Sequence, residues 1–308
     1  MFNFMKYRYF YFLFSALFIV PGLISLALFG LKPSIDFTGG SLLEVQLTQN
    51  TKNIVLNQKN VQEFVNGIYS VSVVQPSGKD QYLIRGTPIS NDQKNQVLEK
   101  LKAQVGEAKE MRFETVGPTL GGELLRKTIL AGVLVAVIII AYVWSQFQNL
   151  KFGVAAVLAM LHDGLVVVGA FSILGKLLNV EVDVLFVTAL LTVLSFSVHD
   201  TIIVFDRIRE MSRKHPRVPF KELVNGAILQ TLGRSINNSM TVIIMLTTLV
   251  LLGGETIRWF AVALLIGAIT GTYSSTFNAA PILVVWDEVA AWWRKRKVTA
   301  KRNKIAAV

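Results

Sequence analysis

The sequence predicts a polytopic α-helical membrane protein with six transmembrane helices and one inserted α+β domain. Three observations support this fold class. Hydrophobic residues make up 52% of the 308 residues and charged residues only 17%, whereas a soluble domain usually carries about 25% charge. The charged residues are missing from long blocks and dense between them, as in other membrane chains. After the first apolar block lies a polar stretch with strand and helix patterns.

The composition excludes several classes of site. The chain has no cysteine, which excludes disulfides, zinc thiolate sites and cysteine nucleophiles. Its formal net charge is +11, but no basic patch alternates with exposed aromatic residues as in nucleic-acid-binding proteins. We therefore expect no nucleic acid partner, and we expect the basic residues to hold cytoplasmic loops beside anionic membrane lipid.

Residues 1–31 form the predicted cytoplasmic N-terminus and first helix. Tyr9 to Leu31 carries no charge, and Lys6 and Arg8 precede it. The segment is long enough to cross a hydrocarbon core of about 30 Å. A cleaved signal peptide has a shorter apolar region and a small-residue cleavage site, so we expect a retained helix.

Residues 32–127 form the predicted water-exposed domain. Period-2 alternation, helical spacing and turn signals indicate six elements in the order β-α-β-β-α-β. The elements are Ser41–Leu47, Lys59–Ile68, Tyr69–Val74, Gln81–Arg85, Asn91–Val105 and Glu110–Val116, with a turn at Pro76-Ser77-Gly78. This order is the split βαβ, or ferredoxin-like, plan. Two amphipathic helices would then cover one face of the sheet.

Residues 128–286 contain five further apolar blocks. The predicted helices are Thr128–Trp144, Phe152–Leu174, Val184–Phe205, Ser235–Gly254 and Trp259–Trp286. The last is long enough to tilt, or to bend at Pro281. We expect residues 206–234 to form an interfacial helix rather than a disordered loop. Residues 287–308 form a basic tail, which we interpret as a stop-transfer anchor rather than a partner site.

The positions of the basic residues predict the orientation. The short loops on one side hold only Lys176 and Arg258, and the other side is rich in Lys and Arg. The positive-inside rule then places both termini in the cytoplasm, which six crossings allow. Residues 32–127 therefore lie outside, in the periplasm or the extracellular space.

Two aspartates, Asp163 and Asp200, stand inside apolar blocks. An ionised Asp at the centre of a lone membrane helix costs ~2.5–3.5 kcal/mol, so such residues usually face a protein interior. Helical spacing puts Ser197 on the same face as Asp200, and Thr201 adds a hydroxyl. The pattern favours a carboxyl that loads and releases a proton. The alternative is a permanently neutral Asp that hydrogen-bonds a neighbouring helix.

The other polar residues near these aspartates leave alternatives open. His162 and Asp163 either belong to a proton pathway or bond each other and pin two helices together. His199 lies about 100° around the helix from Asp200 and is either a relay residue or a packing histidine. Arg234 is either a counter-charge to Asp200 or a snorkelling residue at a helix end.

Two glycine-rich motifs flank the polar domain. Asp36-Phe37-Thr38-Gly39-Gly40 follows the first helix, and Gly117-Pro118-Thr119-Leu120-Gly121-Gly122 precedes the second. Paired glycines suit a tight turn or a close backbone approach, and the second motif is expected to mark a hinge between domain and membrane. In the last helix, Gly267 and Gly271 have GxxxG spacing, which predicts a close helix contact.

Enzyme motifs are missing from the sequence. It contains no Walker A loop, HExxH, GxSxG or dinucleotide fingerprint. We therefore expect no enzymatic activity, no cofactor and no metal site, and ATP is not expected as the direct energy source.

Five segments together resemble the SecF family, the smaller half of the SecDF protein-export component and a relative of the RND transporters. They cover nearly the whole chain in the family's order: IDFTGG at 35–40, VGPTLGGELLRKTI at 116–129, LHDG at 161–164, HDTIIVFDRIRE at 199–210 and LGRSINNS at 232–239. The resemblance implies an RND/SecF-like bundle in the bacterial cytoplasmic (inner) membrane that pairs with SecD around a pseudo-twofold axis. It also implies assistance to a polypeptide passing through the SecYEG translocon.

The resemblance further implies that the proton motive force drives this work, although Na⁺ is not excluded as the coupling ion. The family's essential aspartate falls on Asp200 and its essential arginine on Arg234. His199 departs from the family, which usually has Asn there; a titratable ring would alter the pH range of proton transfer or change nothing. The alternatives are a structural subunit that only completes the SecD bundle, or half of an RND-type small-molecule exporter, for which residues 32–127 are a small outer domain.

Overall fold

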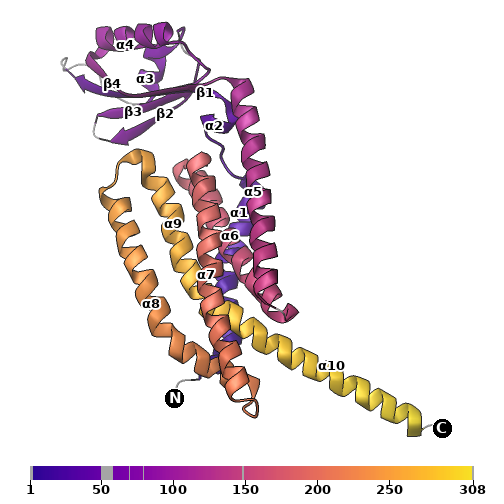
Figure 1. The fold of residues 1–308 in the computed structure, drawn as a ribbon. Coiled ribbons are helices and arrows are strands. Elements are labelled where there is room, and N and C mark those ends of the chain that lie inside the picture. Colours follow the sequence, from indigo (N-terminus) through magenta and orange to yellow (C-terminus); the bar gives the residue numbers. More distant parts are fainter. Residues whose placement is uncertain (1–2, 50–57, 69, 79, 148, 307–308) are drawn as a thin grey trace. The chain divides into compact units, whose positions relative to one another are not determined.

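The structure is a computed structural model, and it describes residues 3–49, 58–68, 70–78, 80–147 and 149–306. The chain forms two compact units, one of residues 33–131 and one of residues 1–32 with 132–308. Figure 1 shows the mixed sheet-and-helix unit and the bundle of long helices.

The smaller unit contains a four-stranded antiparallel sheet with strand order β2-β3-β1-β4. Its elements are α2 (Ile35–Thr38), β1 (Gly40–Gln49), α3 (Gln58–Val65), β2 (Val71–Gly78), β3 (Gln81–Gly86), α4 (Asn91–Val105) and β4 (Gly106–Val116). The order β-α-β-β-α-β from β1 to β4 is the predicted one. Helices α3 and α4 lie on the same face of the sheet (Figure 1).

Alternating residues of β1 form the centre of this unit's core. Leu43, Val45 and Leu47 are fully buried, because every second side chain of a strand points to the same face. The predicted face of α4 packs on them through Val97 and Leu101. The α4 helix begins where predicted because the Ser90 and Gln93 side chains form a capping box.

The predicted turn at Pro76-Ser77-Gly78 is wrong. These residues continue β2, and Pro76 lies opposite Tyr82 of β3. β2 is an edge strand, where a proline costs no ladder hydrogen bond on the solvent side. The chain turns at Asp80 instead, which has φ of 60°. Tyr69, the predicted start of this strand, lies outside the described residues.

The first glycine-rich motif forms a single helical turn. The Asp36 N–H donates to the Ser34 hydroxyl at 3.2 Å, and the Thr38 hydroxyl donates to the Ser34 carbonyl at 3.0 Å. Phe37 is buried. The turn ends at Gly39, which has φ of 72°. A glycine is favoured there because other residues rarely adopt this conformation.

The two glycine-rich motifs pack against each other. A Cβ on Gly39 would lie 2.8 Å from Pro118 Cα, and a Cβ on Gly121 would lie 2.7 Å from the Gly39 nitrogen. Gly40, the first residue of β1, pairs with Val116, the last residue of β4. The predicted close backbone approach is therefore confirmed, while the hinge role of the second motif stays a prediction.

Replacing Gly121 with Ala should destabilise this junction, because its Cβ would overlap the backbone of Gly39. Overpacking of this kind costs about 1–3 kcal/mol. Hydrogen exchange of residues 35–41 in the full chain measures the effect, and exchange should become faster. The matched control is Gly122→Ala, whose Cβ meets nothing within 4 Å. Equal exchange in both variants would contradict the packing argument.

Among the described residues, six helical spans are long and apolar enough to cross a membrane, so the chain is a multi-pass membrane protein. Its helical elements outside the sheet are a 3₁₀ turn at Phe4–Tyr7, α1 (Arg8–Phe29), α5 (Pro118–Gln146), α6 (Leu150–Leu178), α7 (Val184–Lys214), α8 (Phe220–Leu252), α9 (Glu255–Ser274), a π-helical segment at Ser275–Ala279 and α10 (Ala280–Ala306). All of them belong to the larger unit except residues 118–131 of α5, which belong to the smaller one. The sixth span combines α9, the π-helical segment and the start of α10.

Residues 206–214 and 220–234 are helical, as predicted, but they continue α7 and α8 and do not form a separate helix. Helices α7 and α8 instead extend toward each other and leave only residues 215–219 between them. Ile208 on one extension and Val224 and Ile228 on the other are buried in the same hydrophobic core. The two amphipathic segments therefore bury their apolar faces against the bundle.

The π-helical segment ends at Ala279, two residues before Pro281. Proline has no N–H to donate to the carbonyl one turn earlier, and such sites commonly widen or kink a helix. The irregularity predicted at Pro281 therefore begins at Ser275. Single π turns are frequent at functional sites.

Small residues allow the membrane helices to approach closely. A Cβ on Gly169 of α6 would lie 2.7 Å from Gly22 Cα of α1. Close by, the Ser25 and Ser172 hydroxyls are 2.9 Å apart. A Cβ on Gly267 of α9 would lie 2.0 Å from Val193 of α7, so the predicted close contact at the GxxxG site is confirmed.

Gly169→Ala should push α1 away from α6 and destabilise the bundle by about 1–3 kcal/mol. A thermal unfolding scan of the detergent-solubilised chain measures this as a lower Tm. Gly132→Ala on α5 is the control, since its Cβ has no neighbour within 4 Å. A Tm of Gly169→Ala as high as that of the control would refute the contact's importance.

Candidate functional site

The two membrane aspartates are both buried in the helix bundle. Asp163 of α6 is 0% exposed and Asp200 of α7 is 2% exposed. Their burial follows from the high cost of exposing a carboxyl to lipid. Helices α6 and α7 pack against each other, and both pack against α9. The structure therefore brings the two predicted aspartates into one polar region.

Both oxygens of Asp163 are held by neighbouring side chains. Oδ1 lies 2.8 Å from Nδ1 of His162, and the Ser274 hydroxyl donates to Oδ2 at 2.6 Å. The predicted bond between Asp163 and His162 is confirmed. Ser274 ends α9 directly before the π-helical segment, so the bond to Asp163 ties α6 to α9 at that point.

The Asp200 side chain lies near several hydroxyl groups, but one of its carboxyl oxygens has no hydrogen bond to the described residues. Ser197 and Thr201 are fully buried, and Ser239 of α8 lies beside the carboxyl. Among the described residues, Oδ2 of Asp200 and the Ser197 hydroxyl form no hydrogen bond, and the Ser239 hydroxyl is the potential donor beside the carboxyl. Thr201 donates to the Ser197 carbonyl at 2.9 Å. The site can therefore accept a proton or a small polar ligand without breaking an existing bond at Oδ2.

The structure does not bring Arg234 to Asp200. Arg234 is exposed and lies well inside α8, which begins at Phe220. The prediction that Arg234 stands at a helix end is therefore wrong. In the part of the chain that the structure describes, it forms no salt bridge with Asp200. Its proposed role as a counter-charge stays a prediction.

His199 lies on the exposed face of α7 as part of a polar stripe. We call Thr188, Thr192, Ser195 and His199 the α7 stripe; all four are exposed. Helical geometry places them within about 60° of one another around the helix. Such a stripe is unusual for a surface that contacts lipid, because polar groups in membranes usually face protein.

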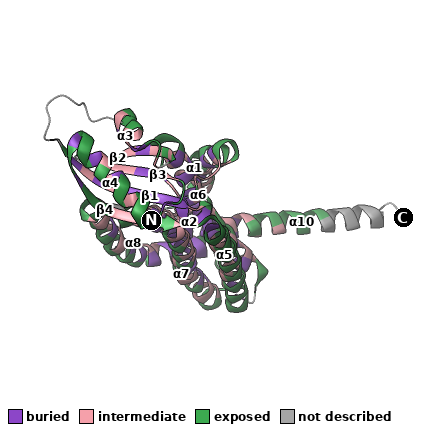
Figure 2. Cartoon of the chain, turned by 90° about the horizontal axis from the view of Figure 1, so that it is seen from above, coloured by how far each residue is buried: buried purple, intermediate pink, exposed green. Residues whose placement is uncertain are grey.

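Helix α8 has a comparable exposed polar face. Arg234, Asn237, Asn238 and Thr241, which we call the α8 polar face, are all exposed and fall within about 100° of one another. In contrast, α5 exposes mainly apolar side chains such as Val133 and Ile138, and it is exposed over most of its length in Figure 2. Only α5 of these three helices has the surface expected for lipid alone.

Sequence reasoning missed several of these residues, although a signal existed for some. Threonines and serine at i, i+4 and i+7 before His199 would have revealed the α7 stripe, as would the adjacent asparagines on α8. Ser274 gives no such signal, because it lies 111 residues from Asp163 in the chain. No group of three or more His, Asp or Glu side chains among the described residues could hold a metal ion.

Comparisons with known proteins identify the family. The model of the C-terminal region of the protein export membrane protein SecD/SecF matches residues 96–289, and the SecD/SecF GG motif matches residues 24–51. Protein translocase subunit SecF of Thermobaculum terrenum is 42% identical and aligns over 93% of this chain and 94% of its own length. SecF of Anaerolinea thermophila is also 42% identical, over 96% of this chain and 98% of its own.

A solved structure agrees with these relatives. The crystal structure of SecDF from Thermus thermophilus, a translocon-associated membrane protein, superimposes with a TM-score of 0.82 at 30% identity. The match covers 93% of this chain but only 39% of that one. The Asp36–Gly40 motif lies in the matched GG region, and Asp163, Asp200 and Arg234 lie in the matched C-terminal region. The chain belongs to the SecF family.

Proposed function

We propose that this chain is a SecF subunit that assists protein export across the bacterial cytoplasmic membrane and that the proton motive force drives it. Membership of the SecF family supports the role in export. The nearly fully buried carboxyl of Asp200, with one oxygen lacking a hydrogen-bond partner among the described residues, is the observation that supports energy coupling. In this proposal the chain has no enzymatic chemistry and no cofactor.

The energy available from one proton is sufficient for a conformational switch. A charge that crosses ~100 mV releases ~2.3 kcal/mol. This biases a two-state equilibrium roughly 50-fold. Protonation also removes the cost of a buried charge, so the two protonation states of Asp200 favour different surroundings.

Asp200 is proposed to take up its proton from the outer side and release it inward. Arg234 would favour release by approaching the carboxyl in another state of the bundle. Ser239, whose hydroxyl lies beside Asp200, is on the same helix as Arg234. It lies about 7.5 Å further along the axis of α8 than Arg234. A displacement of α8 by roughly one turn, ~5.4 Å, would therefore change the distance between the arginine and the carboxyl substantially.

Asp163 is proposed to position helices rather than to carry the proton. Its two oxygens are both engaged, by His162 and Ser274. A carboxyl held in this way pins α6 to α9, where the π-helical segment begins. The buried Ser197 and Thr201 and the exposed His199, all close to Asp200 along α7, are candidates for a proton relay.

The orientation and outer domain follow from the positive-inside rule. Both termini are proposed to lie in the cytoplasm and the four-stranded unit, residues 33–131, in the periplasm. Its element order and antiparallel strand order support a ferredoxin-like domain. A swing of this domain would act on the polypeptide that leaves the SecYEG translocon.

SecD is the proposed neighbour of the α7 stripe and the α8 polar face. Exposed Asn and His side chains are costly toward lipid and suit hydrogen bonds to another helix. The present chain matches only 39% of the SecDF relative. The rest of that chain leaves room for a SecD part joined to the SecF-like part, which supports such a pairing.

Asp200→Asn should abolish gradient-dependent export in membrane vesicles that contain SecD, because the amide cannot exchange a proton. We expect at least a tenfold loss, while assembly with SecD is retained. Asp206→Asn is the matched control on the same helix, because Asp206 is exposed and pairs with Arg209 at 3.3 Å. Replacing the proton gradient with a Na⁺ gradient in the same vesicles identifies the coupling ion. Wild-type export by Asp200→Asn would refute the proton role.

Ser195→Cys should form a disulfide or bismaleimide cross-link with cysteines on the facing helices of SecD. The chain has no native cysteine, so the introduced thiol is its only one. Val133→Cys on the apolar exposed surface of α5 is the control and should not cross-link. Cross-links from Val133 but not from Ser195 would place SecD on the other surface.

A further inference from the structure

A second cluster of buried polar side chains lies where α1 meets the π-helical segment. Ser15 of α1 is 7% exposed, and Asn278 of the π-helical segment is 4% exposed. The Ser15 hydroxyl donates to Oδ1 of Asn278 at 2.9 Å. Because this bond joins residues 263 positions apart in the chain, it fixes the start of the first span against the middle of the last one.

The packing of α1 against α6 adds His162 to this cluster. A Cβ on Gly169 of α6 would lie 2.7 Å from Gly22 Cα of α1. The bonded serine pair one turn further along has the same offset of 147 residues, so the two helices run parallel in one register. Two turns before the glycine pair, this register places Ser15 and His162 opposite each other on nearly the same faces. We call Ser15, His162 and Asn278 the α1–α6–π junction.

Two buried nitrogens of the junction have no hydrogen-bond partner among the described residues. They are Nε2 of His162 and Nδ2 of Asn278. The His162 side chain is only 11% exposed, and its Nδ1 bonds Asp163 at 2.8 Å, so Nε2 points away from Asp163. In a membrane, buried polar groups must be satisfied inside the protein, because each unpaired group is costly. Two such atoms in one cluster indicate a shared small ligand.

The chemistry of the two nitrogens selects water as this ligand. Nδ2 of Asn278 can only donate, which excludes a cation. Nε2 of His162 donates or accepts, according to which ring nitrogen carries the proton. Water accepts from Nδ2 and can either donate to Nε2 or accept from it. Oγ of Ser15 still has lone pairs for a further bond, which gives the three partners that are typical of a buried water.

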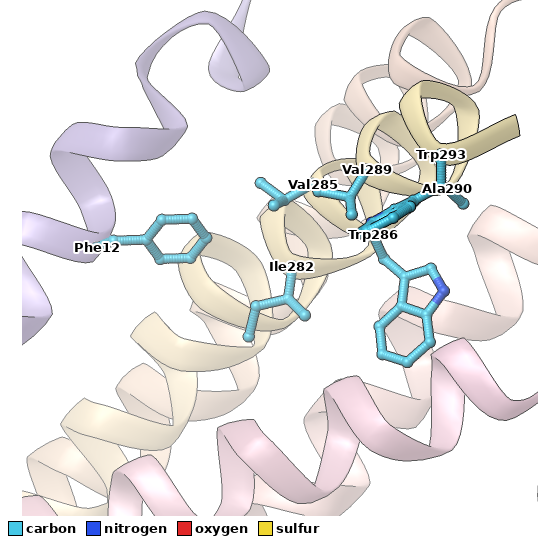
Figure 3. A pocket seen from close by; sticks show the side chains of 7 residues that line it. All are labelled: Phe12, Ile282, Val285, Trp286, Val289, Ala290 and Trp293. Carbon is cyan, nitrogen blue, oxygen red and sulfur yellow. The ribbon is translucent and has the colours of Figure 1, made fainter. Parts of the chain in front are cut away.

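The neighbouring groove cannot supply the missing partner. Figure 3 shows this groove between Phe12 of α1 and one face of α10, with an apolar lining except for Trp286 and Trp293. An indole N–H only donates, as Nδ2 of Asn278 does. None of the three junction residues lines the groove, so the junction is a separate site.

We propose that an ordered water molecule is bound at the α1–α6–π junction, where it bridges Nε2 of His162, Nδ2 of Asn278 and Oγ of Ser15. His162 is then bonded at both ring nitrogens, by Asp163 and by the water. Rotation of the ring would break one of these bonds, so the water keeps His162 on Oδ1 of Asp163. Ser15 and Asn278 are thus positioning residues that act on Asp163 through His162. The site does not depend on proton transfer at Asp200.

The test is solid-state NMR of the full chain in lipid bilayers with ¹⁵N-labelled histidine. Replacing His199 and His215 with Asn leaves His162 as the only labelled residue. We expect water protons to transfer magnetisation to Nε2 at least threefold faster than to Nδ1, because Nδ1 faces Asp163. An Nε2 without water contact, whether bonded directly to Asn278 or to nothing, would overturn the proposal. The measurement changes no other residue of the junction, so a misfolded variant cannot decide it.

Matched variants show whether the junction holds this water. Asn278→Leu keeps a similar side-chain volume but removes Nδ2, and it should abolish the transfer from water to Nε2. Ser15→Ala should weaken the transfer severalfold. Ser25→Ala is the control, because Ser25 is on the same helix and is also 7% exposed, and it should leave the transfer unchanged. Equal losses in the two serine variants, or an unchanged transfer in Asn278→Leu, would overturn the site.

Discussion

The arrangement of the membrane helices depends on the need to keep two carboxyl groups away from lipid. Asp163 and Asp200 belong to α6 and α7, and both are buried. Their burial requires neighbours that tolerate polar groups, which Ser274 of α9 and Ser239 of α8 provide. Four helices thus meet around one polar region, and glycines at 267 and 271 let α9 come close enough to α7 to complete it.

The two carboxyls have different surroundings and therefore different capacities. Asp163 is bonded at both oxygens, by His162 and by Ser274, and the second bond ties α6 to α9. Asp200 has an oxygen without a partner among the described residues, next to the Ser197 hydroxyl in the same condition. A buried polar atom without a partner is costly, so it usually marks a functional role or a site for water. This asymmetry supports Asp200 as the group that changes charge.

The sequence predicted the six spans and the element order of the sheet domain because hydropathy and periodicity are local properties. It placed Ser197 on the face of Asp200 for the same reason and added the Thr201 hydroxyl beside them, and all three residues are buried. It failed where tertiary contacts decide. The extensions of α7 and α8 are stable because Ile208 and Ile228 share a core, and Pro76 is accepted in β2 because that strand is at an edge. Neither the shared core nor the edge position of β2 can be read from a short stretch of sequence.

The account rests on Asp200 changing its protonation in a place shielded from lipid. Infrared difference spectroscopy on membranes that contain this chain and SecD measures this directly through the carbonyl stretching band of a protonated carboxylic acid. We predict a band that appears and disappears as the pH is cycled, is missing from the Asp200→Asn variant and is retained in Asp163→Asn. A spectrum that is unchanged by pH, or whose changing band survives Asp200→Asn, would contradict the account.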